Sequence, residues 1–147
     1  MTIQTPMKSR LELIGRYLDA FDRQDWETVK ACLASDSVHI EPGGMELHGP
    51  EATAEGIKVF KTAMPDLTHT LIRVIEGPDG AVAELVWHGT HTGPLPTPRG
   101  TIEASGRAIQ LSACKVFAFE GDQIKYGRHY WDQMELLAAI GAVPTGG

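Results

Sequence analysis

Two strand-like segments near the C-terminus carry the pattern that decides the fold. The stretch Val116-Phe-Ala-Phe-Glu-Gly-Asp-Gln-Ile-Lys125 leads directly into Tyr126-Gly-Arg-His-Tyr-Trp-Asp-Gln-Met-Glu-Leu-Leu-Ala-Ala-Ile-Gly141. Aromatic and β-branched residues favour strands, and the Glu-Gly-Asp turn between the segments predicts a hairpin. The second strand ends at Asp132, whose carboxylate is suited to cap the short amphipathic helix that follows.

The first half of the chain has the apolar spacing of helices. A first helix is expected over 7–23, and Asp25 is expected to cap a second helix that reaches Leu33. A third helix is expected over 49–64, with one proline near its start and another just beyond its end. Between the second and third helices, residues 37–41 form a short extended segment that ends at Pro-Gly-Gly.

The second half of the chain has the period of two that is typical of strands. Strands are expected over 68–76, 81–92, 106–120 and 123–131. The segment 93–100 contains three prolines, so we expect a long loop that stays out of the sheet centre. Helices followed by antiparallel strands predict one α+β domain over residues 1–147, in which a curved sheet wraps over the helices as a cone with an internal pocket.

Composition excludes several classes of partner. The chain has 147 residues and a formal net charge of −6, which argues against nucleic acid or an anionic membrane as partner. No apolar run is long enough to span a membrane, and the N-terminus has no secretory pattern. Two cysteines without metal-like spacing indicate free thiols, so we expect a cytoplasmic protein.

His88 and His91 would point to opposite faces of a strand, so no metal is expected.

Five short motifs resemble one known family. They are Ala63-Met-Pro-Asp66, Trp87-His-Gly-Thr-His-Thr-Gly-Pro-Leu95, Thr101-Ile-Glu-Ala-Ser-Gly-Arg107, Phe119-Glu-Gly-Asp-Gln-Ile124, and Tyr130-Trp-Asp132 leading to Leu136-Leu-Ala-Ala-Ile-Gly141. Together they resemble the nuclear transport factor two-like (cystatin-like) superfamily, and within it the SnoaL-like polyketide cyclases, also called ester cyclases. The resemblance implies an enzyme without a cofactor that closes a small, hydrophobic, carbonyl-bearing molecule by an aldol-type reaction.

The resemblance implies that Asp132 is the general acid/base. A carboxyl group in an apolar pocket has a raised pKa, which suits proton transfer in both directions. The alternative is a plain helix N-cap. His129 lies two residues before Trp131, so both side chains are expected to line the cavity, with His129 as the second catalytic residue. The alternative for His129 is a core histidine bonded to a backbone carbonyl.

Further side chains are candidates for substrate binding. His91 is in phase with Trp87 and can face the pocket, or it can be a strand-end histidine that holds the Pro-rich loop. Trp87, Trp131, Phe117 and Met134 are suited to pack against a flat hydrophobic ligand, although aromatic residues at strand spacing are also plain core.

Tyr17 and the pair Glu41-Pro42 resemble the ketosteroid isomerases, a sister family, in which a tyrosine donates to an enolate and an acidic residue moves the proton. The second oxyanion donor of those enzymes, an aspartate, falls at about Lys115, which is a departure from their pattern. Lys115 is in phase with apolar residues of its strand. Inside, it would pair with a carboxylate or become an amine nucleophile, whereas a β-bulge would turn it outward.

Three functions follow from these observations. The first is the aldol-type cyclase. The second is an epoxide hydrolase or isomerase in the same cavity, although Arg128 and Asp132 match the hydrolase set only in part. The third is a small-molecule-binding module that forms a homodimer through an outer stripe of the sheet, formed by Gln110, Ser112, Val116 and Ala118.

Overall fold

The computed structural model describes residues 7–143. In chain order the elements are α1 (Met7–Asp22), α2 (Trp26–Ala31), β1 (Leu33–Glu41), β2 (Met45–His48), α3 (Gly49–Ala63), β3 (Thr68–Gly77), β4 (Gly80–Thr90), β5 (Leu95–Thr97), β6 (Gly100–Ile102), β7 (Ala108–Glu120), β8 (Gln123–Trp131) and α4 (Gln133–Ala139). The expected order of helices, strands and a last helix is confirmed.

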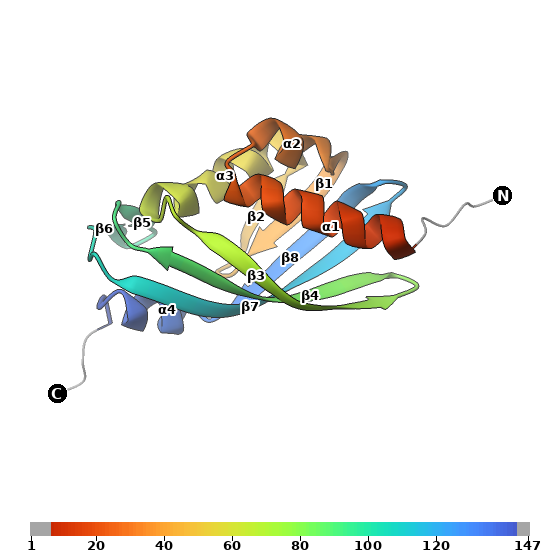
Figure 1. Ribbon diagram of the computed structural model, residues 1–147. Coiled ribbons are helices and arrows are strands. Elements are labelled where there is room, and N and C mark those ends of the chain that lie inside the picture. Colours follow the sequence, from red (N-terminus) through yellow and green to blue (C-terminus); the bar gives the residue numbers. More distant parts are fainter. Residues whose placement is uncertain (1–6, 144–147) are drawn as a thin grey trace.

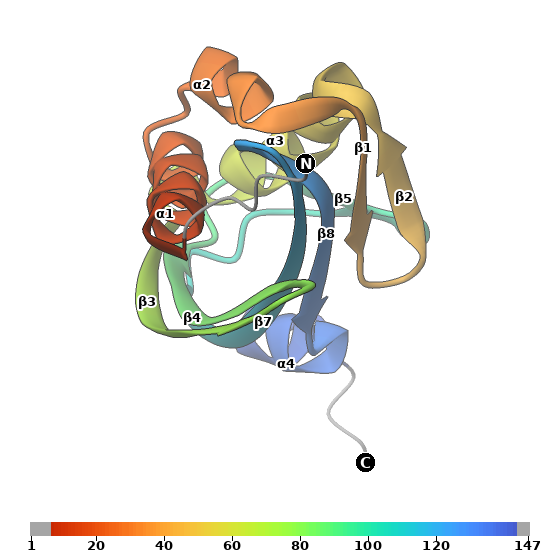
Figure 2. The ribbon, with the colours of Figure 1, turned by 90° about the vertical axis from the view of Figure 1, so that its right-hand side faces the viewer.

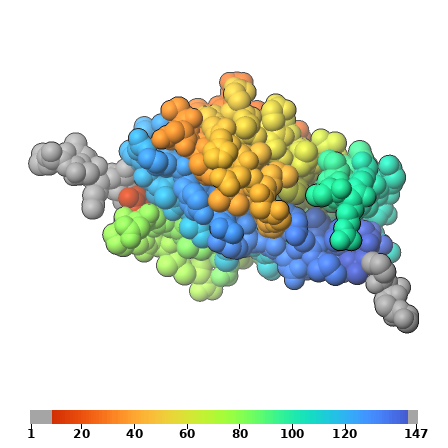
Figure 3. All heavy atoms as spheres, turned by 180° about the vertical axis from the view of Figure 1, so that it is seen from behind, coloured from red at the N-terminus to blue at the C-terminus, as the bar shows by residue number. Residues whose placement is uncertain are grey.

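The main sheet has six strands in the order β2-β1-β8-β7-β4-β3. It is strongly curved, and α1 and α3 lie across its hollow side (Figures 1 and 2). Seen from behind, α3 and the β1–β2 hairpin cover one side of the molecule, above β8 (Figure 3). The expected α+β cone is therefore confirmed.

The sheet is mixed, whereas an antiparallel sheet was expected. β1 pairs with β8 in parallel, with His39 opposite Gly127, and the other neighbouring strands are antiparallel. β1 begins at Leu33, so the expectation that α2 reaches this residue is wrong. The backbone turns into the sheet there because Ile124 N–H of β8 donates to the carbonyl of Cys32.

Pro42-Gly43-Gly44 is a turn between two paired strands, whereas the sequence predicted only that the extended segment ends there. Both glycines have positive φ angles, 92° and 81°, which glycine adopts without steric cost. The chain reverses here and β2 pairs antiparallel with β1. The Pro-rich segment stays out of the main sheet as expected, and it contributes to the separate hairpin β5–β6.

The core lies between α1 and the hollow side of the sheet. Leu13, Ile14, Tyr17, Leu18 and Phe21 are the buried face of α1. Burying each such side chain stabilises the fold by roughly 1.5–3 kcal/mol, so this face fixes α1 over the sheet. No helix in residues 7–143 is long and apolar enough to cross a membrane.

Candidate active site

A cavity opens between the helices and the hollow side of the sheet. Its empty space is about 580 Å³, including the part that opens to solvent. Most of the wall is apolar, with Phe60 from α3, Trp87 from β4 and Leu136 from α4 among the lining residues. Five residues with titratable side chains interrupt this wall: Tyr17, His39, Glu41, Lys115 and His129. All five are buried.

His129 is held from both sides of its ring. Nδ1 lies 2.9 Å and 3.1 Å from the two carboxylate oxygens of Glu41. The indole N–H of Trp87 donates to Nε2 at 3.1 Å. Because an indole nitrogen can only donate, Nε2 must carry the lone pair and Nδ1 the proton. His129 is therefore a neutral imidazole that donates to Glu41.

Glu41 is the acidic group of the cavity. Burial opposes its charged form, but the interactions with His129, together with those of His39, outweigh burial and hold the pKa of Glu41 below its usual range. His39 Nε2 lies 3.6 Å from Glu41 Oε2. Burial, assisted by the positive charge of Lys115, lowers the pKa of His39 to about 4. At neutral pH Glu41 is therefore a carboxylate and His39 is uncharged.

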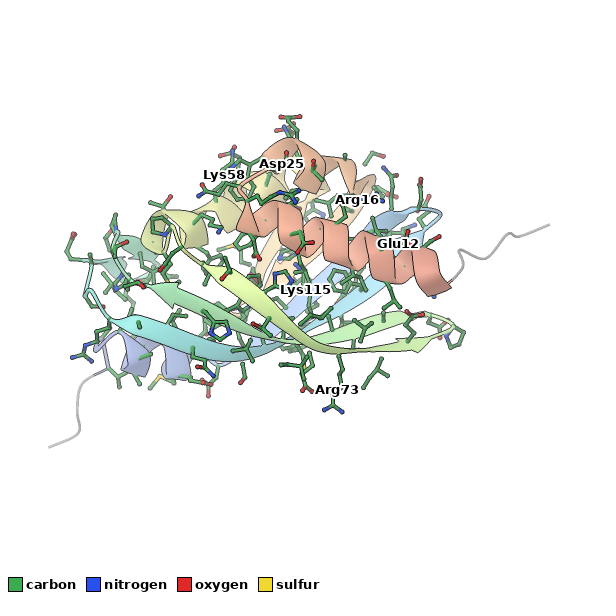
Figure 4. The ribbon with its side chains drawn as sticks, in the orientation of Figure 1. Glu12, Arg16, Asp25, Lys58, Arg73 and Lys115 are labelled. Atoms are coloured by element: carbon green, nitrogen blue, oxygen red, sulfur yellow. The ribbon has the colours of Figure 1, made fainter. Side chains whose placement is uncertain are left out.

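Tyr17 and Lys115 form the second polar group of the cavity. Lys115 Nζ donates to the Tyr17 hydroxyl at 3.3 Å and lies 4.5 Å from the centre of the tyrosine ring. Burial lowers the pKa of Lys115 to about 8, against the opposing influence of Glu41. Burial also raises the pKa of Tyr17, with further contributions from Glu41 and Cys32. Figure 4 shows Lys115 beneath α1, whereas Glu12, Arg16 and Arg73 lie on the outside.

The regular alternation of β7 places Lys115 inside. Its register with β4 runs without a break from Ala81 opposite Phe117 to Thr90 opposite Ala108. The β-bulge that would have turned Lys115 outward is therefore not present at this position, and that alternative is wrong. On β8 the register shifts only beyond this point, between Ala118 and Phe119.

Asp132 lies outside the cavity, which corrects the expectation that it faces the pocket. Its side chain is exposed and accepts from Met134 N at 2.9 Å and from Glu135 N at 3.3 Å. β8 ends at Trp131, and the carboxylate turns toward the free amides of the first turn of α4. The N-cap alternative is confirmed, and Asp132 is not among the residues that line the cavity.

The other expected positions divide into two groups. Tyr17, Glu41, Trp87, Lys115, His129 and Trp131 line the cavity as expected. Phe117 is buried behind Tyr17, with ring centres 6.3 Å apart, and Met134 is exposed, so neither contacts the cavity.

His91 is buried away from the cavity, so its pocket assignment is wrong. Its Nδ1 accepts from Ser105 N at 3.1 Å, and its backbone N–H donates to the carbonyl of Arg107 at 2.9 Å. These bonds attach the end of β4 to the segment that precedes β7. His91 is a strand-end histidine that holds a loop segment, close to the alternative given above.

His39 is a cavity residue that the sequence reasoning missed. It alternates with Glu41 on β1, and both are buried on the same face. Residues 37–41 were expected to be extended, so a period of two from Glu41 was a sufficient signal for His39. Space for His39 depends on Gly127 of β8, where a Cβ atom would lie 3.3 Å from His39 Nδ1 and 3.5 Å from Lys115 Cε.

One cluster elsewhere has the residue types of a metal site. Ligand atoms of Asp19, Asp22 and His69 lie within 4.8 Å of one another near the end of α1. His69 Nδ1 already lies 2.8 Å from Asp22 Oδ2, so this nitrogen has a hydrogen-bond partner. None of the three residues lines the cavity.

Comparison with known proteins assigns the family. The family model of the SnoaL-like polyketide cyclases matches residues 11–140. The chain belongs to this family. The comparison with curated protein sequences gives no match.

Solved structures share the fold at low sequence identity. A putative SnoaL-like polyketide cyclase from Jannaschia sp. CCS1 is 19% identical, with a TM-score of 0.83, and the match covers 98% of this chain and 100% of the other. TsrD from Streptomyces laurentii is 24% identical, with a TM-score of 0.81 and coverage of 95% and 100%. An epoxide hydrolase of the LEH-like type from M. tuberculosis is 18% identical, with a TM-score of 0.69 and coverage of 90% of each chain. These similarities establish the nuclear transport factor two-like fold.

Proposed function

We propose that this member of the SnoaL-like family is an enzyme that moves a proton on a small, largely apolar, carbonyl-bearing molecule and so promotes aldol-type ring closure. One observation carries the proposal: a single apolar cavity contains a carboxylate–imidazole pair, Glu41 and His129, and a hydroxyl–amine pair, Tyr17 and Lys115. Proton abstraction next to a carbonyl needs a base for the carbon and a donor for the oxygen.

Tyr17 is the donor in this scheme. Its oxygen accepts a hydrogen bond from Lys115, so its own proton is free to point into the cavity toward a carbonyl oxygen. When the carbon loses its proton, negative charge develops on that oxygen. A buried donor at this position is typically worth about 3–4 kcal/mol of barrier in comparable sites.

The Glu41–His129 pair is the proton acceptor. Glu41 is charged at neutral pH, and His129 orients its carboxylate through the Nδ1 proton. The enolate carbon then attacks a second carbonyl carbon of the same molecule. The alkoxide that results takes a proton back from the pair, so the enzyme is unchanged after one cycle.

A second candidate function is isomerisation, favoured by the placement of Tyr17 and Glu41 in one cavity. It uses the same first step and returns the proton to a different carbon. Epoxide hydrolysis has less support, because Arg128 is exposed and, within the described chain, no arginine is among the residues that line the cavity.

The test is proton exchange in heavy water with a short linear diketone whose closure gives a cyclic β-hydroxy ketone. Nuclear magnetic resonance reports both the loss of the protons next to the carbonyl and the appearance of the cyclic product. We expect wild-type protein to accelerate exchange, and Glu41→Gln and Tyr17→Phe each to reduce it by about a hundredfold or more.

Asp132→Asn is the matched control, because an asparagine still caps α4 and the side chain lies outside the cavity. It should exchange protons at the wild-type rate. Loss of exchange in Asp132→Asn with full activity in Glu41→Gln would overturn the assignment of the catalytic pair.

A further inference from the structure

Resting on the proposed function, we propose that Lys115 captures the substrate covalently, by forming an imine between its Nζ and the carbonyl carbon of a small apolar ketone or aldehyde. The proposal adds a nucleophile to the acid/base groups described above. It also narrows the substrate class to molecules whose carbonyl carbon can reach the inner wall of the cavity at β7.

Two buried lysines allow a comparison within this chain. The ammonium of Lys61 donates to the backbone carbonyls of Asp22, at 2.8 Å, and of Leu67. Lys115 is equally buried, at 5% exposed against 4%, but its hydrogen bond goes to the Tyr17 hydroxyl at 3.3 Å. Among residues 7–143, no carboxylate lies within ion-pair distance of Lys115 Nζ. Lys61 is a structural lysine, whereas Lys115 keeps hydrogen-bonding capacity that faces a cavity.

Burial favours the neutral amine of Lys115, because the ammonium loses its hydration there. The rings of Tyr17 and Phe117, at 4.5 Å and 5.6 Å from Nζ, attract an ammonium, but the low pKa of Lys115 shows that burial outweighs this attraction. With a pKa of about 8, roughly one molecule in ten holds a neutral amine at pH 7. A desolvated lysine in an apolar pocket is the arrangement that activates an amine for attack on a carbonyl.

The neighbouring groups supply what the reaction needs. The Nζ lone pair forms a bond to the carbonyl carbon, and the π electrons of the carbonyl move to its oxygen, which takes a proton from the Tyr17 hydroxyl. The nitrogen returns a proton to Tyr17, and the carbinolamine hydroxyl then takes that proton and leaves as water, which gives the protonated imine beside the Tyr17 phenolate. Amine and carbonyl are converted into imine and water, with no oxidant and no net change in protons. Glu41 then removes a proton from the neighbouring carbon of the protonated imine.

The test uses cyclohexanone as the probe and cyanoborohydride as the reductant that makes an imine permanent. Peptide mass spectrometry of the intact, folded protein after treatment locates the added mass. We expect Lys115 to be labelled at least about tenfold more than Lys61 or the surface residue Lys58, because of these three lysines only Lys115 lines the apolar cavity. The variants Lys115→Arg and Lys115→Met, checked for folding by circular dichroism, should lose this label, and Lys58→Met should keep it.

Equal labelling of all lysines, or no label at Lys115, would overturn the inference. Exchange of the cyclohexanone protons in heavy water, measured in parallel without reductant, separates it from the proposed function. If proton exchange depends on Glu41 but Lys115 is not labelled, the acid/base proposal stands and the proposal of an imine at Lys115 is wrong. Absence of both exchange and label in the wild-type protein removes both proposals.

Discussion

Glu41 and Lys115 place opposite charges in one buried cavity without forming an ion pair. Removing a charge from water costs several kcal/mol unless another group compensates for the lost hydration. Glu41 is compensated by His129 and His39, whereas Lys115 has the Tyr17 hydroxyl and two aromatic rings. The ammonium of Lys115 is therefore less stabilised than the carboxylate of Glu41. As a result, Glu41 stays charged, whereas Lys115 readily loses its proton.

The lowered pKa of Lys115 predicts how stability varies with pH. Its folded value of about 8 lies below the ordinary 10.5, so between these values the unfolded chain binds more protons. The free-energy cost of burying the charged ammonium of Lys115 is fully present below pH 8, and it decreases as the pH rises to 10.5. Relative to Lys115→Met, wild-type protein should gain on the order of 3 kcal/mol across this window. Urea denaturation of both proteins from pH 7 to 10.5 measures the difference, and a constant difference would contradict the lowered pKa.

Residue-level reasoning from the sequence succeeded where strand alternation holds. It placed His129, Trp131 and Trp87 in the cavity, and the structure confirms all three. It failed at Asp132, because alternation ends with the strand and the side chain of the next residue is directed by the amides of α4. Glu41, expected to bind substrate or, by the isomerase resemblance, to move a proton, provides the carboxylate that pairs with His129. That pairing joins residues 88 positions apart, and no local pattern reports it.

At the scale of elements, β8 determines the geometry of the cavity. It pairs in parallel with β1, which carries His39 and Glu41, and antiparallel with β7, which carries Lys115. The sequence predicted β8 with its correct bounds and also the antiparallel hairpin, because both are local features. It did not predict the pairing with β1, because that contact joins the two ends of the chain and depends on the whole sheet being formed.

Gly127 of β8 lies between His39 of β1 and Lys115 of β7. A methyl group there would lie 3.3 Å from His39 Nδ1, so His39 must shift by a few tenths of an ångström, whereas the 3.5 Å distance to Lys115 Cε is an ordinary contact. We expect Gly127→Ala to fold with stability changed by about 1 kcal/mol or less, and to lose proton exchange by about tenfold, because His39 lies beside Glu41.

Gly77→Ala is the control for this prediction, because a methyl group at Gly77 would meet no atom within 4 Å. Both glycines lie within strands, Gly77 at the end of β3 and Gly127 in the middle of β8, so each substitution restricts a strand backbone. Equal activity of the two variants would show that space at Gly127 does not position His39.

At the scale of the whole molecule, the outer face of the sheet carries exposed apolar side chains. Ile75 of β3 is 63% exposed and Tyr130 of β8 is 48% exposed. Of the expected outer stripe on β7, Gln110 and Ser112 are exposed, and Val116 and Ala118 are half-buried. α1, α2 and α3 all lie on the other side of the sheet (Figure 2). Arg128 lies opposite Val116 on this face, so the apolar side chains are interrupted by charge. Exposed apolar side chains such as Ile75 and Tyr130 favour association with another surface.

We predict that two copies of this chain associate through that face, and that the site works within each copy. Sedimentation velocity should show a dimer, and Val116→Arg should shift it to monomer, because a guanidinium on an apolar interface is left without hydration or a partner. Glu12→Lys on the exposed side of α1 is the control, and it should leave the dimer intact (Figure 4).

Since residues of one chain supply both polar groups of the cavity, the Val116→Arg monomer should keep proton exchange within about twofold of wild type. A wild-type protein that sediments as a monomer contradicts the interface, and a Val116→Arg monomer that is folded but inactive contradicts the independence of the site.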